Sequence, residues 1–104
     1  MATKHHNISG EVTQVLLAAG DGINVKSISI VNTHADTPCT ADLYIERSGV
    51  GKFYIVKNLT LPVGATLILE GNDVKFNNSA LQFGLFIKLT KTLSETPSVD
   101  VIIN

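Results

Sequence analysis

The sequence predicts an all-β fold of about eight short antiparallel strands in a β-sandwich, either a jelly roll or an immunoglobulin-like sandwich. Three observations support this class. Apolar and polar residues alternate in short runs, turn-forming residues separate the runs, and no segment shows a sustained helical period. A length of 104 residues with 44% hydrophobic residues suits one domain with one aliphatic core.

The first two strands are expected at residues 12–17 and 23–32. Residues 20–22, Gly-Asp-Gly, form a turn between them, because the two glycines adopt positive φ at little cost. In the second run Ile28 and Ile30 share one face. The opposite face carries Ser27, Ser29 and Val31.

The next strands are expected at residues 40–47 and 53–56, joined by a Ser-Gly-Val-Gly turn at residues 48–51. A loop with Pro38 precedes them, since proline has no amide hydrogen to give to a sheet. The first of these runs alternates like a half-buried antiparallel strand. One face carries Ala41, Leu43 and Ile45, and the other carries Asp42, Tyr44 and Glu46.

Four further strands complete the predicted sandwich. They are expected at residues 66–69, 74–76, 81–90 and 98–103, with turn residues at 62–64, 70–73 and 77–79. The run at 81–90 has the clearest alternation. Its apolar face consists of Leu81, Phe83, Leu85, Ile87 and Leu89.

The balance of charge argues against nucleic acid as a partner. Eight basic and nine acidic residues give a net charge of −1, and the lysines are scattered along the chain. No run approaches the roughly 20 apolar residues that cross a bilayer, and the N-terminal residues do not resemble a signal peptide. We therefore expect no membrane partner, and a cytoplasmic location until assembly or lysis carries the protein out.

Residues 1–10 are polar and show no pattern, so they are expected to form a flexible or partner-bound arm before a single domain at residues 11–104. His5 and His6 are adjacent in this arm. Two tandem imidazoles cannot enclose a metal ion, which needs three or four convergent ligands. We therefore expect His5 and His6 to lie in a flexible or interface-bound tail, where they are candidate interface residues.

No arrangement of residues predicts an enzyme, a metal site or a cofactor. Residues 49–52 resemble the end of a phosphate-binding loop, but a strand follows them where that motif has a helix. Cys39 and His34 lack a third orienting group, and a lone cysteine is more often a packing residue. The turn at residues 70–73 has two carboxylates, too few for calcium.

Tyr44, Phe86 and Ile102 are expected at an interface with another protein. Each lies on the strand face opposite an apolar stripe, where a sheet covered on one side would carry polar residues. An exposed apolar patch in a soluble protein marks an interaction surface. The same aromatic residues could stack on sugars, although the aromatic content of 6% and the lack of Trp count against it.

Four segments together resemble a known family: residues 25–33 (VKSISIVNT), 41–45 (ADLYI), 61–67 (LPVGATL) and 99–103 (VDVII). Their order is similar to that of small β-sandwich virion proteins of tailed bacteriophages, of the marine and cyanobacterial myovirus type. The resemblance covers about 80 residues and consists of core positions and turns, so it transfers no site residues. It implies a structural protein that binds other virion proteins, either major capsid or neck and tail proteins.

Together these expectations predict a phage virion structural protein. The first-ranked role is a capsid decoration or cement subunit that forms a homo-oligomer in the assembly. Its location would be the virion, and the host cytoplasm during assembly. One alternative is a neck or tail ring component. A second is a carbohydrate-binding module for host attachment, and a hydrolase ranks last because no acid–base pair is evident.

Overall fold

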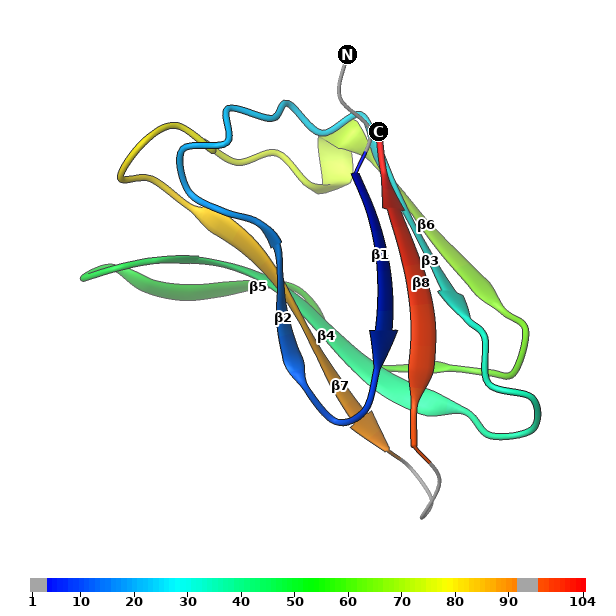
Figure 1. Cartoon of the computed structure of the whole chain (residues 1–104). Helices are drawn as coiled ribbons and strands as arrows, with labels where there is room; N and C mark the ends of the chain where they lie inside the picture. Colours follow the sequence, from blue (N-terminus) through cyan, green and yellow to red (C-terminus); the bar gives the residue numbers. More distant parts are fainter. Residues whose placement is uncertain (1–3, 92–95) are drawn as a thin grey trace.

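The computed structural model describes residues 4–91 and 96–104, and it confirms the predicted β-sandwich. Eight strands form two antiparallel sheets of four strands each (Figure 1). One short 3-10 helix, Gly71–Asp73, lies between the sixth and seventh strands. The strands are β1 (Lys4–Ser9), β2 (Thr13–Leu17), β3 (Ser27–Asn32), β4 (Cys39–Arg47), β5 (Gly51–Leu61), β6 (Thr66–Glu70), β7 (Gly84–Lys91) and β8 (Ser98–Ile103).

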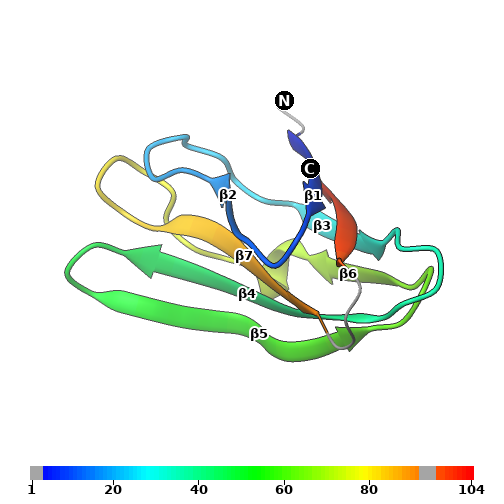
Figure 2. The same ribbon diagram turned by 60° about the horizontal axis from the view of Figure 1, so that its bottom comes forward.

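The strand order identifies the sandwich as a jelly roll. The sheets have the orders β1-β8-β3-β6 and β2-β7-β4-β5 (Figures 1 and 2). The first strand pairs with the last, the second with the seventh, the third with the sixth and the fourth with the fifth. This is the pairing of one long hairpin rolled into two sheets, as in jelly rolls. An immunoglobulin-like sandwich of seven strands would instead have the strand orders 1-2-5-4 and 3-6-7.

The hydrophobic core lies between the two sheets and is aliphatic. The predicted alternation holds in β3, where Ile28 and Ile30 are buried and the intervening residues are partly exposed. It also holds in β7 and β8, whose inward side chains are almost fully buried. Those residues are Leu85, Ile87 and Leu89 in β7, and Val99, Val101 and Ile103 in β8.

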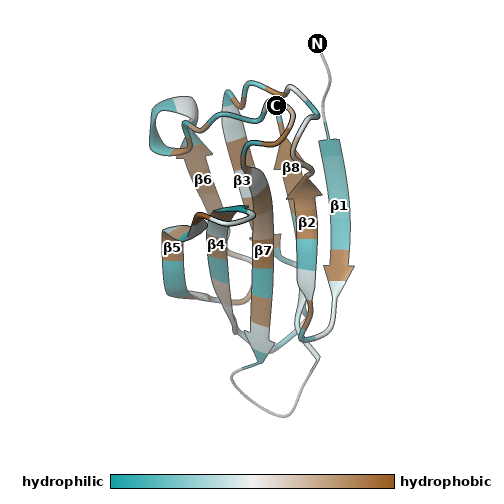
Figure 3. Cartoon of the chain, turned by 90° about the vertical axis from the view of Figure 1, so that its left-hand side faces the viewer, coloured by the Kyte–Doolittle hydropathy of each residue, from teal (hydrophilic) through white to brown (hydrophobic). Residues whose placement is uncertain are grey.

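The expectation that residues 1–10 form an arm is wrong for residues 4–9. They form β1, which pairs with β8 in continuous register from Lys4 opposite Ile103 to Ser9 opposite Ser98. Backbone pairing holds this strand, and Ile8 is its one buried side chain. Figure 3 shows β1 as largely hydrophilic, with a hydrophobic band near its end. Residues 1–3 of the expected arm lie outside the described residues.

The strand expected at residues 74–76 is also wrong. Val74 is buried, but it follows the 3-10 helix in a stretch without regular structure. The chain packs closely here, since a Cβ at Gly71 would lie 2.9 Å from the carbonyl oxygen of Val25. The number of strands therefore agrees with the prediction because β1 takes the place of this segment.

β5 is much longer than the strand expected at residues 53–56. It extends to Leu61 through a bulge, where its register with β4 shifts and Asn58 adopts a φ of 53°. The Asp42 carboxylate accepts a hydrogen bond of 2.6 Å from the backbone N–H of Asn58. The bulge breaks the alternation of the sequence, which explains why only part of this strand was predicted.

Candidate functional site

A row of four large side chains crosses the outer face of the β2-β7-β4-β5 sheet. Val15 lies opposite Phe86, Phe86 opposite Tyr44, and Tyr44 opposite Tyr54. We call these four residues, of which all but Val15 are aromatic, the aromatic row. The rings of Tyr44 and Phe86 stack, with centroids 5.4 Å apart and planes 9° apart, and the Tyr54 ring lies 5.4 Å from Tyr44 at a tilt of 49°. The two predicted interface aromatics are thus direct neighbours across two strands.

Tyr44 lies between Phe86 and Tyr54 in this row and is buried, in contrast to the expectation from sequence. It is only 3% exposed, because Phe86 and Tyr54 cover its ring from the two neighbouring strands. The Lys52 Nζ lies over the same ring, 4.9 Å from its centroid. Burial raises the pKa of the Tyr44 hydroxyl, while Lys52 opposes this rise. Tyr54 and Val15, each 44% exposed, are the most exposed members of the row, and Phe86 is partly exposed.

Exposed lysines outnumber exposed carboxylates around the aromatic row. Lys52, Lys57 and Lys88 are exposed, and the Lys57 Nζ lies 4.2 Å from the centroid of the Tyr54 ring. Of the nearby carboxylates, Glu46 lies opposite Lys52 and is partly exposed, whereas Asp42 is buried and turned to the backbone of Asn58. This face therefore combines exposed aromatic carbon with cationic groups, as in cation–π contacts.

Ile102 and His5 lie on the other outer face of the sandwich. They are opposite each other on β8 and β1 of the β1-β8-β3-β6 sheet. The expectation of one patch containing Phe86 and Ile102 is therefore wrong, because the strand order places these side chains on opposite faces. His6 points the other way from His5, and its Nε2 lies 3.1 Å from the carbonyl oxygen of Leu16. His6 thus ties β1 to β2, and only His5 is exposed.

Leu81 is a candidate contact residue that the sequence analysis placed in a strand. The strand begins instead at Gly84, and Leu81 lies in the preceding loop with a φ of 63° and 86% of its surface exposed. It lines a shallow hollow together with Phe86 and residues 46–48 at the end of β4. Left-handed backbone is costly for leucine, and strain of this kind tends to be kept at functional positions. The hollow joins Leu81 to the aromatic row.

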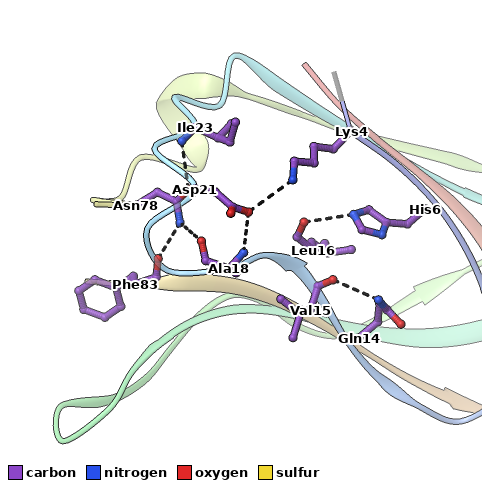
Figure 4. A network of polar contacts seen from close by, with 10 residues as sticks. All are labelled: Lys4, His6, Gln14, Val15, Leu16, Ala18, Asp21, Ile23, Asn78 and Phe83. Atoms are coloured by element: carbon purple, nitrogen blue, oxygen red, sulfur yellow. Dashed lines mark hydrogen bonds and ion pairs between the residues drawn. The ribbon is translucent and has the colours of Figure 1, made fainter. Parts of the chain in front are cut away.

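Asn78 fixes the loop that contains Leu81, and Figure 4 shows the Asn78 side chain with its polar partners. Its side-chain N–H groups donate to the carbonyl oxygens of Ala18 and Phe83, at 3.0 and 2.9 Å. Its side-chain oxygen accepts from the Ile23 backbone N–H at 3.1 Å. One buried amide therefore joins the β2–β3 loop to the loop before β7. Figures 1 and 2 show these loops at the same end of the sandwich as the β4–β5 turn.

The other two candidate residues, Cys39 and His34, contribute to the core and to a loop. Cys39 is buried in the core, and this burial raises the pKa of its thiol. The Nδ1 of His34 accepts a hydrogen bond from the Thr37 backbone N–H at 3.1 Å. Over residues 4–91 and 96–104, no group of three or more His, Cys, Asp or Glu side chains could hold a metal ion. The same residues contain no helix of the length and hydrophobicity needed to cross a bilayer.

Comparison with known proteins shows the fold and no family. The sequence matches no protein-family model and no curated protein sequence. The structure is similar to the Yersinia pseudotuberculosis-derived mitogen, with a TM-score of 0.51 and 19% identity over 99% of this chain and 83% of the mitogen chain.

Viral particle structures also share this fold. The infectious bursal disease virus Gt strain has a TM-score of 0.53 and 14% identity, over 98% of this chain and 32% of the viral chain. The T13 particle of the same virus has a TM-score of 0.54 and 15% identity, over 98% of this chain and 30% of the viral one. The chain thus spans about a third of those viral chains. The structural neighbours of this jelly roll include viral capsid proteins.

Proposed function

We propose that this chain is a structural subunit of a phage virion, a capsid decoration or cement subunit that binds other virion proteins. The observation that carries the proposal is the aromatic row with the adjoining hollow and Leu81, on the outer face of one sheet. The jelly-roll fold, which viral capsid proteins share, supports it. So does the phage resemblance of residues 25–33, 41–45, 61–67 and 99–103.

The aromatic row suits a protein contact because its members are held before any partner arrives. Tyr54 packs against Tyr44, which is buried between its neighbours, so binding orders few new side chains. Tyrosine also offers a large contact area with few rotatable bonds. The exposed Lys52, Lys57 and Lys88 outnumber the one partly exposed carboxylate, Glu46, which favours a partner surface that is acidic around an apolar centre.

The test is sedimentation of the purified chain with DNA-free heads and, separately, with isolated tails of the virus that encodes it. We expect saturable binding to heads that weakens as salt is raised, because cationic side chains contribute to it. Replacing both exposed members of the row, Val15→Ser and Tyr54→Ala, is expected to weaken binding by at least about tenfold.

The matched control is Ile102→Ser, which removes an exposed apolar side chain from the opposite outer face. It is expected to bind heads like the parent chain. Equal binding by the double variant would contradict the role of the aromatic row. Binding to tails and not to heads would replace decoration with the neck or tail alternative.

The geometry does not favour the carbohydrate-binding alternative. A sugar-stacking platform needs an open ring face, and the Tyr44 ring is covered by Phe86, Tyr54 and Lys52. Tyr54 alone is reachable among the tyrosines of the row. Glycan binding that Tyr54→Ala leaves intact would therefore have to use another surface.

A further inference from the structure

The jelly roll has four strands at sheet edges, and three of them carry features that oppose pairing with another chain. β5 has Lys52, Lys57 and a bulge at Asn58, and β2 has a register shift between Val15 and Leu17. β1 begins with a lysine and two histidines. Charges and bulges of this kind protect sheet edges from adding strands.

β6, with the sequence TLILE, lacks these features. Its register with β3 is regular from Thr66 to Glu70, and no charged residue precedes Glu70 in the strand. Ile68, at its centre, is 61% exposed. β6 is the last strand of the β1-β8-β3-β6 sheet in the described part of the chain.

The backbone groups that β6 offers at its outer edge can be identified. The Asn32 N–H donates to the Ala65 carbonyl oxygen, so the alternate residues Ala65, Leu67 and Leu69 bond to β3. The N–H and C=O groups of Thr66, Ile68 and Glu70 therefore point away from β3. This agrees with the hydrogen bond that Glu70 N–H makes to the Asp73 carboxylate at 3.1 Å.

We infer that β6 pairs with β6 of a second copy of this chain, antiparallel about a two-fold axis at Ile68, so that two sheets join into one. The strand is complementary to itself in this arrangement. Ile68 lies against Ile68 of the second copy on the outer face, and Leu67 lies against Leu69 on the inner face. Glu70 meets Thr66, which keeps the two Glu70 carboxylates apart.

The available hydrogen bonds fit the same register. The two Ile68 residues exchange two bonds, and each Thr66 N–H reaches the Glu70 carbonyl oxygen of the other copy. These four bonds leave the contact between Glu70 and Asp73 in place. The inference does not depend on the proposed attachment to virions, since it uses a different surface from the aromatic row.

The first test compares the mass of the parent chain in solution with that of Ile68→Lys, by light scattering on a sizing column and by sedimentation equilibrium. We expect a dimer for the parent and at least a tenfold weaker dimer for Ile68→Lys, because two lysines would lie directly opposite each other. Ile102→Lys is the matched control on the same outer face, two strands from the edge, and is expected to remain dimeric. Circular dichroism verifies that both variants are folded.

The second test is disulfide cross-linking of Ile68→Cys under mild oxidation. In a hydrogen-bonded antiparallel pair the two Cα atoms are about 5.5 Å apart, within reach of a disulfide. The native Cys39 is buried and does not compete. Ile68→Cys is expected to cross-link into dimers much faster than Ile102→Cys.

Three results would overturn the inference: a monomeric parent chain, a dimer that survives Ile68→Lys, or equal cross-linking rates for the two cysteine variants. A monomeric parent that binds an extended segment of another protein at β6 would also reject it, because the second copy would then be the wrong occupant.

Discussion

Two buried asparagines hold the loops at the two ends of the sandwich. Asn78 bonds three backbone groups at the end that carries Leu81. Asn32 does the same at the other end, where its side chain donates to the carbonyl oxygens of Thr37 and Leu61 and accepts from the His34 N–H. Buried backbone groups in loops need such partners, and an amide provides both donors and an acceptor.

Asn78→Ala is therefore expected to lower the free energy of unfolding by about 2–3 kcal/mol, because three backbone groups lose their partner at once. Urea denaturation measures the change. Asn24→Ala is the control, because Asn24 is exposed in the same region, and we expect a change within about 0.5 kcal/mol. Equal stability of the two variants would show that water replaces the Asn78 side chain.

Substitutions at Leu81 are expected to affect the stability of the fold and the binding to a partner in different ways. Leu81→Gly removes a left-handed leucine, whose cost is roughly 1–2 kcal/mol, and adds the greater chain entropy of glycine, about 0.5–1 kcal/mol. We expect the unfolding free energy to stay equal or rise by up to about 1.5 kcal/mol, while binding to viral heads weakens. Leu81→Ala is the control: it should lose binding without the gain in stability. A Leu81→Gly chain that binds normally would remove Leu81 from the contact surface.

Ionisation of Tyr44 is expected to lower the free energy of unfolding at alkaline pH. Burial raises the pKa of its hydroxyl in the folded state, so above a pH of about 10 the unfolded chain loses this proton first. Stability is then unaffected at lower pH and falls as pH rises toward the folded-state pKa. Urea unfolding at pH values of about 8 and about 10.5 should show a smaller loss for Tyr44→Phe than for the parent chain. The same loss in both proteins would exclude Tyr44 as its cause.

Among the elements, β1 shows best what the sequence could and could not predict. The alternation of Leu85, Ile87 and Leu89 predicted β7, although with a start three residues too early, because burial on one face leaves a pattern. β1 has one buried side chain and depends on backbone pairing with β8, which is distant in sequence and leaves no pattern. The site was only partly predicted for the same reason. Tyr44 and Phe86 were candidates, but their contact with each other, and the position of Ile102 on the opposite outer face, depend on strand order.

β1 is expected to contribute to the free energy of unfolding, which a flexible arm would not do. Ile8→Ala should lower the free energy of unfolding by about 2–4 kcal/mol, because Ile8 is buried in the core. His5→Ala, on the exposed face of the same strand, is the control and should change it by less than about 0.5 kcal/mol. Thermal and urea unfolding both measure the difference. Two variants of parental stability would mean that β1 is dispensable.

At the scale of the whole molecule, the topology makes most strand pairings distant in sequence. In the described part of the chain, β4 and β5 are the only consecutive strands that pair with each other. The pairing of β1 with β8 closes nearly the entire chain into a loop. Pairings of this kind are slow because the chain loses entropy before the contacts form. We therefore expect folding to begin at the β4–β5 hairpin.

A circular permutation tests this order of events. Lys4 lies opposite Ile103, so a linker of about four residues can join the ends and turn β8 and β1 into a hairpin. New ends between Val63 and Gly64, both exposed, cut a connection between the two sheets and no hairpin. We expect this permutant to refold at least about threefold faster in stopped-flow experiments, because a distant pairing has become local. The control permutant, with the same linker and new ends between Ser48 and Gly49, loses the β4–β5 hairpin and should refold more slowly than the first. If both permutants refold at the same rate, the β4–β5 hairpin is not where folding starts.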